Sequence, residues 1–306
     1  MKIFFYIFLL SILINSKNIL FAQSFAIGKQ INDYFSFNNE INLKINSGDW
    51  TVIRNQSRGL PKQKIVGIGR VENNEIVEII EVYEGVLSGY YVKYIDPILI
   101  EIVFKDKHDG CYERAEYYLI ELYRKGSSFN CMIIRHMDVL KELKYPDSPN
   151  GKAAASAYNF WIKQNSLNYP RILLESYHTY FSRIAGGKWY EVRRYIHPKL
   201  LNGPKSRFFS EETSEYHKFN ISNFPKHEKT MKNWISISSK FHKEFEKMVK
   251  SKDKHKLSLE SYFIEDEIKV ISGDKIADQL NKLNELFKSQ SITKEEFEKA
   301  KKKILN

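Results

Sequence analysis

The sequence predicts an α+β fold built on an antiparallel, hairpin-rich sheet with packed helices. Three pairs of β-type segments flank short turn sequences, and residues 228–250 have the apolar periodicity of a long amphipathic helix. Hairpins join antiparallel neighbours, whereas parallel strands need long crossovers, so we expect an antiparallel sheet. Residues 274–306 carry two further short apolar stripes and predict a C-terminal two-helix hairpin.

Composition limits the class of protein. The chain has 306 residues, of which 42% are hydrophobic and 14% aromatic, enough for a packed core. These values exclude collagen-like, disulfide-rich and wholly disordered chains. The formal net charge is +11, and the excess lies in residues 151–273, which hold 22 basic and 13 acidic side chains. Residues 24–150, with 16 basic and 18 acidic side chains, are nearly balanced.

Residues 1–23 have the pattern of a secretory signal peptide. Lys2 precedes the apolar run Ile3–Ile14, and the small residues Ala22 and Ser24 offer cleavage points. The apolar run is well short of the roughly 20 residues that span a bilayer. We therefore expect a periplasmic or secreted protein. The alternative is a chain anchored by an uncleaved N-terminal segment.

The two cysteines, Cys111 and Cys131, are expected to form a disulfide. They are the only cysteines of the chain, and a lone pair usually bonds in an oxidising compartment. Closing that loop would stabilise the fold by about 3 kcal/mol. If the hairpin around Gly126-Ser127 forms, the residue opposite Cys131 is near Leu122, so Cys111 must approach from a preceding segment.

Residues 24–150 are expected to be the β-rich part of the body. The predicted strands are Trp50–Arg54, Lys64–Val71, Glu75–Tyr83, Ile98–Phe104, Tyr117–Arg124 and Asn130–His136. Asn73-Asn74 and residues 125–128 are hairpin turn sequences. A Pro- and Gly-containing loop at 146–151 ends this part.

Residues 151–273 are expected to be the α+β part of the body. The predicted elements are a helix over Lys152–Gln164, a hairpin of Ile172–Ile184 with Lys188–Ile196, a loop over Pro198–Pro225 and a short strand over Tyr262–Val270. Between the loop and the last strand lies the amphipathic helix 228–250. Its apolar face includes Met231, Trp234 and Phe241, and its other face is rich in lysine.

The C-terminal segment resembles a known family. Leu280, Leu283 and Phe287 form one stripe, and Phe297 and Ile304 belong to the second. Thr293 and Glu296 have the spacing of a capping box at the start of the second helix. Together with the Ile-Thr-x-Glu-Glu-Phe sequence at 292–297, this pattern resembles the bacterial short C-terminal domain, SHOCT. The resemblance implies an appended helical hairpin used in oligomerisation or in holding a partner, and it implies no reaction.

No recognisable catalytic motif is present, and no cofactor or metal site is expected. The sequence lacks H-E-x-x-H, G-x-S-x-G and P-loop patterns. His136 and Asp138 are two apart on a predicted strand and share a face, and His178 could approach them from a neighbouring strand. These three residues are the candidate active site of an alternative in which the protein is a periplasmic hydrolase or transferase.

The strand 188–196 is a candidate ligand surface. Trp189, Arg193 and Tyr195 alternate onto one face, where they could stack on a glycan or hold an anionic ligand. Ordinary strand composition explains the same pattern. The lysine face of helix 228–250 could likewise attract an anionic membrane or envelope surface, or be only a solvated helix face. The expected compartment disfavours nucleic acid as a partner.

From these observations we expect an exported, non-enzymatic protein. A disulfide-linked α+β body would carry the SHOCT-like hairpin 274–306, which would mediate self-association or the docking of a protein partner.

Overall fold

The computed structural model describes most of the body and part of the tail. The described residues are 25–37, 41–58, 62–86, 117–125, 128–146, 149–182, 188–207, 210, 212–251, 259–260, 280, 283–284, 287–288 and 293–305. The expected signal peptide, the strands predicted at 98–104 and 262–270, and Cys111 lie outside these residues. No helix among the described residues is long and apolar enough to span a membrane.

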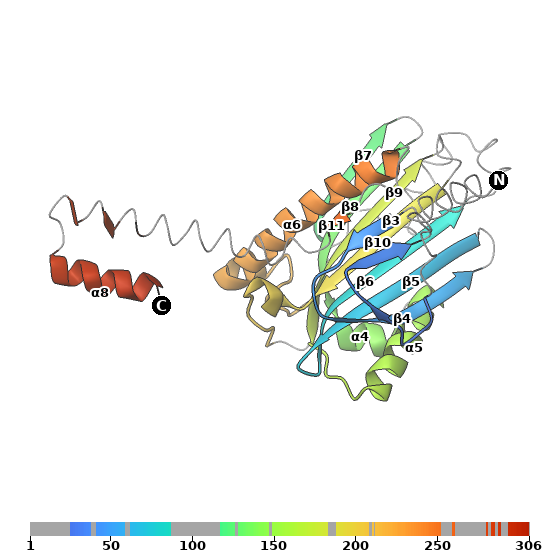
Figure 1. The fold of residues 1–306 in the computed structure, drawn as a ribbon, viewed down its shortest axis with the longest axis horizontal. Coiled ribbons are helices and arrows are strands. Elements are labelled where there is room, and N and C mark those ends of the chain that lie inside the picture. Colours follow the sequence, from blue (N-terminus) through green and yellow to red (C-terminus); the bar gives the residue numbers. More distant parts are fainter. Residues whose placement is uncertain are drawn as a thin grey trace, which may run out of the picture.

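An eight-stranded antiparallel sheet forms the body (Figure 1). Its order is β1-β4-β5-β6-β10-β9-β8-β7. The bounds are β1 Gln30–Ile31, β4 Asp49–Arg58, β5 Lys62–Glu72, β6 Glu75–Val86, β7 Tyr117–Lys125, β8 Ser128–Asp138, β9 Ile172–Ser182 and β10 Lys188–Ile196. The α+β class and the antiparallel sheet predicted from the sequence are confirmed. The sheet takes strands from both sides of the boundary predicted at 146–151, so the two parts of the body share one sheet.

The predicted hairpins form with the expected pairing. Asn73 and Asn74 both have positive φ at the turn between β5 and β6, as the preferred two-residue hairpin turn requires. Strands β9 and β10 pair along their length, from Ser182 with Lys188 to Leu174 with Ile196. In the β7–β8 hairpin Leu122 lies opposite Cys131, as the sequence predicts.

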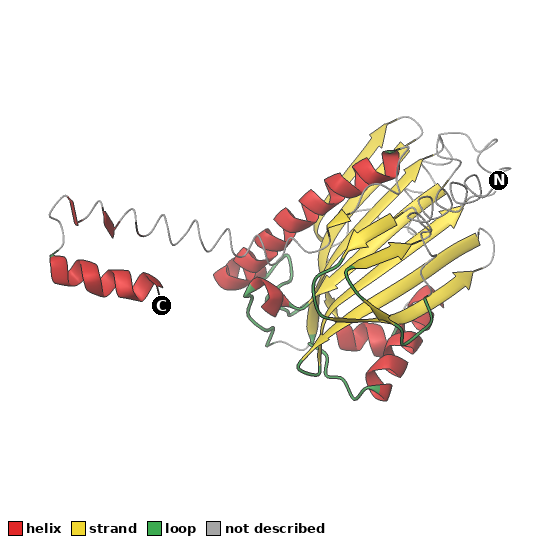
Figure 2. Ribbon diagram, viewed as in Figure 1, coloured by secondary structure: helices red, strands yellow, loops and turns green. Residues whose placement is uncertain are grey.

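One face of the sheet is covered by a long helix and a small second sheet (Figure 2). Helix α6, Pro225–Lys250, packs Met231, Trp234 and Ile237 against β8, β9 and β10, and Phe241 and Phe245 into a second apolar cluster. The small sheet has the order β11-β3-β2, with β2 Tyr34–Phe37, β3 Ile41–Lys44 and β11 Leu259–Glu260. We call this side of the sheet the helix-covered face.

The opposite face is partly covered by two helices, α4 Val139–Lys144 and α5 Pro149–Gln164. Trp161 of α5 lies directly over Gly69, where a Cβ would come within 2.5 Å of its ring. We call this side the α5 face. Helix α5 begins three residues before the predicted start because Pro149 is well suited to the first turn of a helix.

The predicted loop 198–225 is largely irregular, with two short 3-10 turns, η2 Pro198–Leu201 and η3 Ile221–Asn223. Buried Glu215 organises it by accepting hydrogen bonds from the Ser206 hydroxyl at 2.6 Å and the Arg207 backbone at 3.1 Å. This loop leads directly into α6.

Candidate functional site

Strand β10 places two consecutive arginines on opposite faces of the sheet. Val192 and Ile196 point into the clusters under α6, and Tyr195 points into the cluster under α5. Because successive residues of a strand face opposite ways, Arg194 lies on the helix-covered face and Arg193 on the α5 face. Each guanidinium lies about 5 Å from the centres of two aromatic rings, but in different surroundings.

Arg194 is enclosed completely. Its guanidinium carbon lies 5.1 Å from the ring centre of Trp234 and 4.8 Å from that of Phe241, both on α6. Its side chain has no exposed area, and it lies 3.8 Å from the carboxylate of Glu78 on β6. Burial lowers the pKa of Arg194 to about 10 although Glu78 opposes this. Arg194 is thus a buried charge that holds α6 to the sheet.

Glu78 joins two buried arginines. Besides Arg194, it lies 3.3 Å from Arg70, whose guanidinium carbon is 5.8 Å from the ring centre of Trp50. Burial raises the pKa of Glu78 against the opposing effect of the two arginines. This network extends the ionic contacts of the helix-covered face from β10 to β5.

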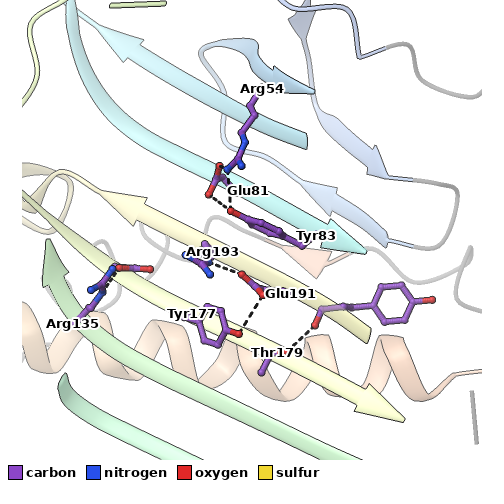
Figure 3. Close-up of polar contacts among 10 residues, drawn as sticks. Arg54, Glu81, Tyr83, Arg135, Tyr177, Thr179, Glu191 and Arg193 are labelled. Atoms are coloured by element: carbon purple, nitrogen blue, oxygen red, sulfur yellow. Dashed lines mark hydrogen bonds and ion pairs between the residues drawn. The ribbon is translucent and has the colours of Figure 1, made fainter. Parts of the chain in front are cut away.

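Arg193 is held by strands alone (Figure 3). Its guanidinium carbon lies 5.2 Å from the ring centre of Tyr83 on β6 and 5.0 Å from that of Tyr177 on β9. Its Nε donates to Glu191 at 2.5 Å, and the Tyr177 hydroxyl donates to the other oxygen of that carboxylate at 3.2 Å. One third of the Arg193 side chain is exposed, in contrast to Arg194. We call Arg193, Tyr83, Tyr177 and Glu191 the Arg193 clamp.

A second ion pair fixes one wall of the clamp. Arg54 Nη1 donates to Glu81 at 2.5 Å, and the Tyr83 hydroxyl donates to the other oxygen of Glu81 at 2.8 Å (Figure 3). Burial alone would raise the pKa of Glu81, but the nearby Arg54 and Arg193 outweigh it and keep the pKa low. Glu81 is therefore a stable anion that orients the Tyr83 ring beside Arg193.

The backbone register explains how the clamp is assembled. Arg193 pairs with Glu81 on one side and with Tyr177 on the other, and Glu191 pairs with Tyr83. Gly67 lies between Arg54 and Glu81 in the same row of the sheet. A Cβ there would come within 3.2 Å of the Arg54 side chain, so the glycine leaves room for the Arg54–Glu81 pair.

The structure separates the three residues of the predicted ligand surface. Trp189 and Arg193 both lie on the α5 face, and Trp189 is half-buried with its ring over Gly85. Tyr195 is on the same face but is buried in the cluster beneath α5, so it is not available to a ligand. The alternation of residues along the strand predicted that the three side chains share a face. Only the position of α5 shows that the end of this face at Tyr195 is covered.

His136, Asp138 and His178 have separate partners. The His136 ring meets that of His217 at 5.7 Å, and Asp138 caps α4 and pairs with Arg171 at 2.6 Å. His178 contacts Ser176 and His242 at 3.0 and 3.3 Å.

Backbone pairing sets the distance between the two histidines. His136 pairs with Leu174, four residues before His178 on β9, which places the two backbones about 13 Å apart. The three side chains do not converge on one point. Among the described residues, no three His, Cys, Asp or Glu side chains form a group that could hold a metal ion.

The lysine face of α6 is exposed as predicted, but part of its charge is paired. Lys232 pairs with Glu228 at 2.7 Å, Lys247 with Glu244 at 2.6 Å, and Lys250 with Glu246. These pairs lie on the same helix and reduce the attraction of this face for an anionic surface.

In the tail, the predicted capping box is present at the start of α8, Lys294–Leu305. The Thr293 backbone donates to Glu296 at 2.9 Å, and the Glu296 backbone donates to the Thr293 hydroxyl at 3.3 Å. The rings of Phe287 and Phe297 meet at 4.8 Å, so the two predicted apolar stripes contact each other.

Residues 278–305 match the family model of the short C-terminal domain, SHOCT. The tail is a SHOCT domain. The match covers the two stripes and the capping box, and no family model matches the body. No curated protein and no solved structure matches the chain. The body must therefore be interpreted from its own geometry.

Proposed function

We propose that this chain is an exported, non-enzymatic protein whose SHOCT domain mediates self-association or the docking of a protein partner. The observation that carries this proposal is the incomplete burial of the apolar stripes of the tail. Phe287 is 37% exposed, and Leu280, Phe297 and Ala300 are only half-buried.

Helix length supports the same proposal. Helix α8 has 12 residues, at the lower limit for a helix that persists alone in water. The Thr293–Glu296 capping box and the Phe287–Phe297 contact each add to its stability. A further apolar surface that covered Leu280, Phe297 and Ala300 would complete the packing, and a second copy of the domain or a partner helix could supply it.

The expected compartment rests on the sequence. The signal-like pattern of residues 1–23 supports export, and Cys131, buried on β8, supports a disulfide with Cys111 in an oxidising compartment. Mass spectrometry of the exported chain would test both, since cleavage and disulfide formation each change the mass.

The test of the proposal is the light-scattering mass of the mature chain, with and without residues 274–306. We expect a concentration-dependent oligomer that becomes a monomer on truncation. Phe297→Ala should weaken the oligomer, whereas Lys302→Ala, an exposed position on the same helix, should not. A monomer in both forms would exclude self-association, and failure of the tail to retain any protein partner would then exclude docking.

A further inference from the structure

The Arg193 guanidinium is held in one orientation by its surroundings. Tyr83 and Tyr177 lie on either side of it, and Glu191 engages its Nε. The hydrogen bond from this guanidinium to Glu191 uses Nε. Neither Nη group donates to a partner among the described residues. The Nη groups form one side of a rigid fork that matches the two oxygens of a carboxylate.

Three other arginines of the sheet are more deeply enclosed than Arg193. Arg54 and Arg194 have no exposed side-chain area, and Arg70 is nearly buried. Arg135 also lies on the α5 face and is partly exposed, and its Nε is paired with Glu175. Arg193 therefore combines exposure with two aromatic walls.

Trp189 lies on the same face of β10, four residues before Arg193 and about 13 Å away along the strand. Its ring is half-buried and lies over Gly85, where a Cβ would come within 2.7 Å of the ring. Only a ligand that spans this distance could contact both side chains.

The charges around the clamp permit an added anion. Glu81 is already engaged by Arg54, so its charge is compensated locally. Burial raises the pKa of the Glu191 carboxyl, although Arg193 opposes this, so Glu191 takes up a proton more readily than an exposed glutamate. An incoming carboxylate would meet less repulsion than the number of acidic residues suggests.

We propose that the Arg193 clamp binds the carboxylate of a small ligand, with the Nη groups of Arg193 donating to it. The carboxylate could belong to a sugar acid or to an apolar aromatic acid. This site is separate from the SHOCT domain, so its failure would leave the proposed function of the tail untouched.

The test is isothermal titration of the full mature chain with two carboxylates and their neutral counterparts. Glucuronate is compared with glucose, and 3-phenylpropionate with 3-phenylpropionamide. We expect at least one carboxylate to bind with a Kd on the order of 1 mM or tighter, and its neutral counterpart to bind at least ten-fold more weakly. Preference for glucuronate identifies a sugar acid, and preference for 3-phenylpropionate identifies an apolar acid.

Two variants connect binding to the clamp. Arg193→Lys keeps the charge but removes the fork, and we expect it to weaken binding at least ten-fold. Arg135→Lys, the same change at another arginine on the α5 face, should leave the Kd within about two-fold of wild type. The proposal is overturned if wild type does not distinguish a carboxylate from its neutral counterpart, or if Arg193→Lys binds as well as wild type. The wild-type comparison can still overturn the proposal if a variant fails to fold.

Discussion

Each face of the central sheet holds one arginine beside aromatic rings, but one arginine is buried and the other is partly exposed. Arg194 and Arg193 are consecutive on β10, and each guanidinium lies about 5 Å from two aromatic rings. On the helix-covered face both rings come from α6, which lies above the sheet and seals the arginine. On the α5 face both rings come from neighbouring strands in the plane of the sheet.

The difference shows that the exposure of each arginine depends on which element supplies the aromatic rings beside it. Rings from a helix packed on the sheet exclude solvent from the arginine, so its role is limited to stabilising the fold. Rings supplied from within the sheet fix its orientation and leave its outer edge accessible, as the one-third exposure of Arg193 shows. We assign a structural role to Arg194 and a binding role to Arg193.

The largest expected effect is the loss of stability in Arg194→Met. The substitution roughly preserves volume but leaves Glu78 buried with one cationic partner fewer. We expect the free energy of unfolding to fall by about 3 kcal/mol, measured by urea denaturation. Arg193→Met is the matched control, with an expected loss of about 1 kcal/mol or less, because its ion pair is partly exposed. Equal losses in the two variants would contradict the distinction between the faces.

Acid should weaken the helix-covered face through its buried histidines. His242 on α6 and His178 on β9 lie 3.3 Å apart, and burial lowers the pKa of His242 to about 4 and that of His178 well below its ordinary value. Below pH 6.5 the unfolded chain takes up protons that the folded chain does not, so stability falls as pH decreases toward 4. His242 alone accounts for about 3 kcal/mol of this loss.

The control for this pH dependence is His242→Gln, which cannot titrate. Urea denaturation at pH 7 and pH 4 should show a smaller loss of stability for the variant than for wild type, by about 3 kcal/mol. His197, whose pKa burial also lowers to about 4, titrates in both proteins and cancels in the comparison. An identical pH dependence in the two proteins would show that His242 is not buried against the sheet as described.

Two glycines divide the α5 face into a closed end and an open end. A Cβ at Gly69 would meet the buried ring of Trp161 at 2.5 Å, and one at Gly85 would meet the half-buried ring of Trp189 at 2.7 Å. Gly69→Ala should lower the free energy of unfolding by about 2 kcal/mol, because α5 must shift. Gly85→Ala should cost about 1 kcal/mol or less and change tryptophan fluorescence, because Trp189 can move outward. A larger loss for Gly85→Ala would mean that this end is closed as well.

The smallest expected effect lies in the tail. Thr293→Ala removes one half of the capping box and should destabilise α8 by about 1 kcal/mol, seen as faster amide hydrogen exchange at its first turn. Lys294→Ala, at the neighbouring exposed position, should leave that exchange unchanged. Neither variant should alter the unfolding of the body, and a change there would indicate that the tail contributes to the stability of the sheet.

Much of the fold could be predicted because its signals are local. The three hairpins, the apolar stripe of α6 and the Thr293–Glu296 box each depend on residues within one or two elements. Even the position of Leu122 opposite Cys131 follows from one turn sequence. The small sheet was not predicted, because β2 and β3 are four residues each and their alternation is too short to recognise.

The candidate site was predicted only in part. Arg193 and Trp189 are four residues apart on one strand, so their shared face follows from the two-residue period. Tyr83 and Tyr177 come from strands about 100 residues apart, and only the order β6-β10-β9 brings them to either side of Arg193. Tyr195 lies on the same face by the same two-residue spacing, but it is buried beneath α5. The sequence contains no signal for where that helix packs.

The most direct test of the distinction between the two arginines is a nuclear magnetic resonance titration that follows their side-chain Nε–H signals in the same wild-type sample. Glucuronate or 3-phenylpropionate, whichever binds more tightly, is added to saturation. We expect the Arg193 signal to shift progressively and saturate while the Arg194 signal stays in place. An unchanged Arg193 signal, or a shift of Arg194 that follows the same curve, would contradict this expectation.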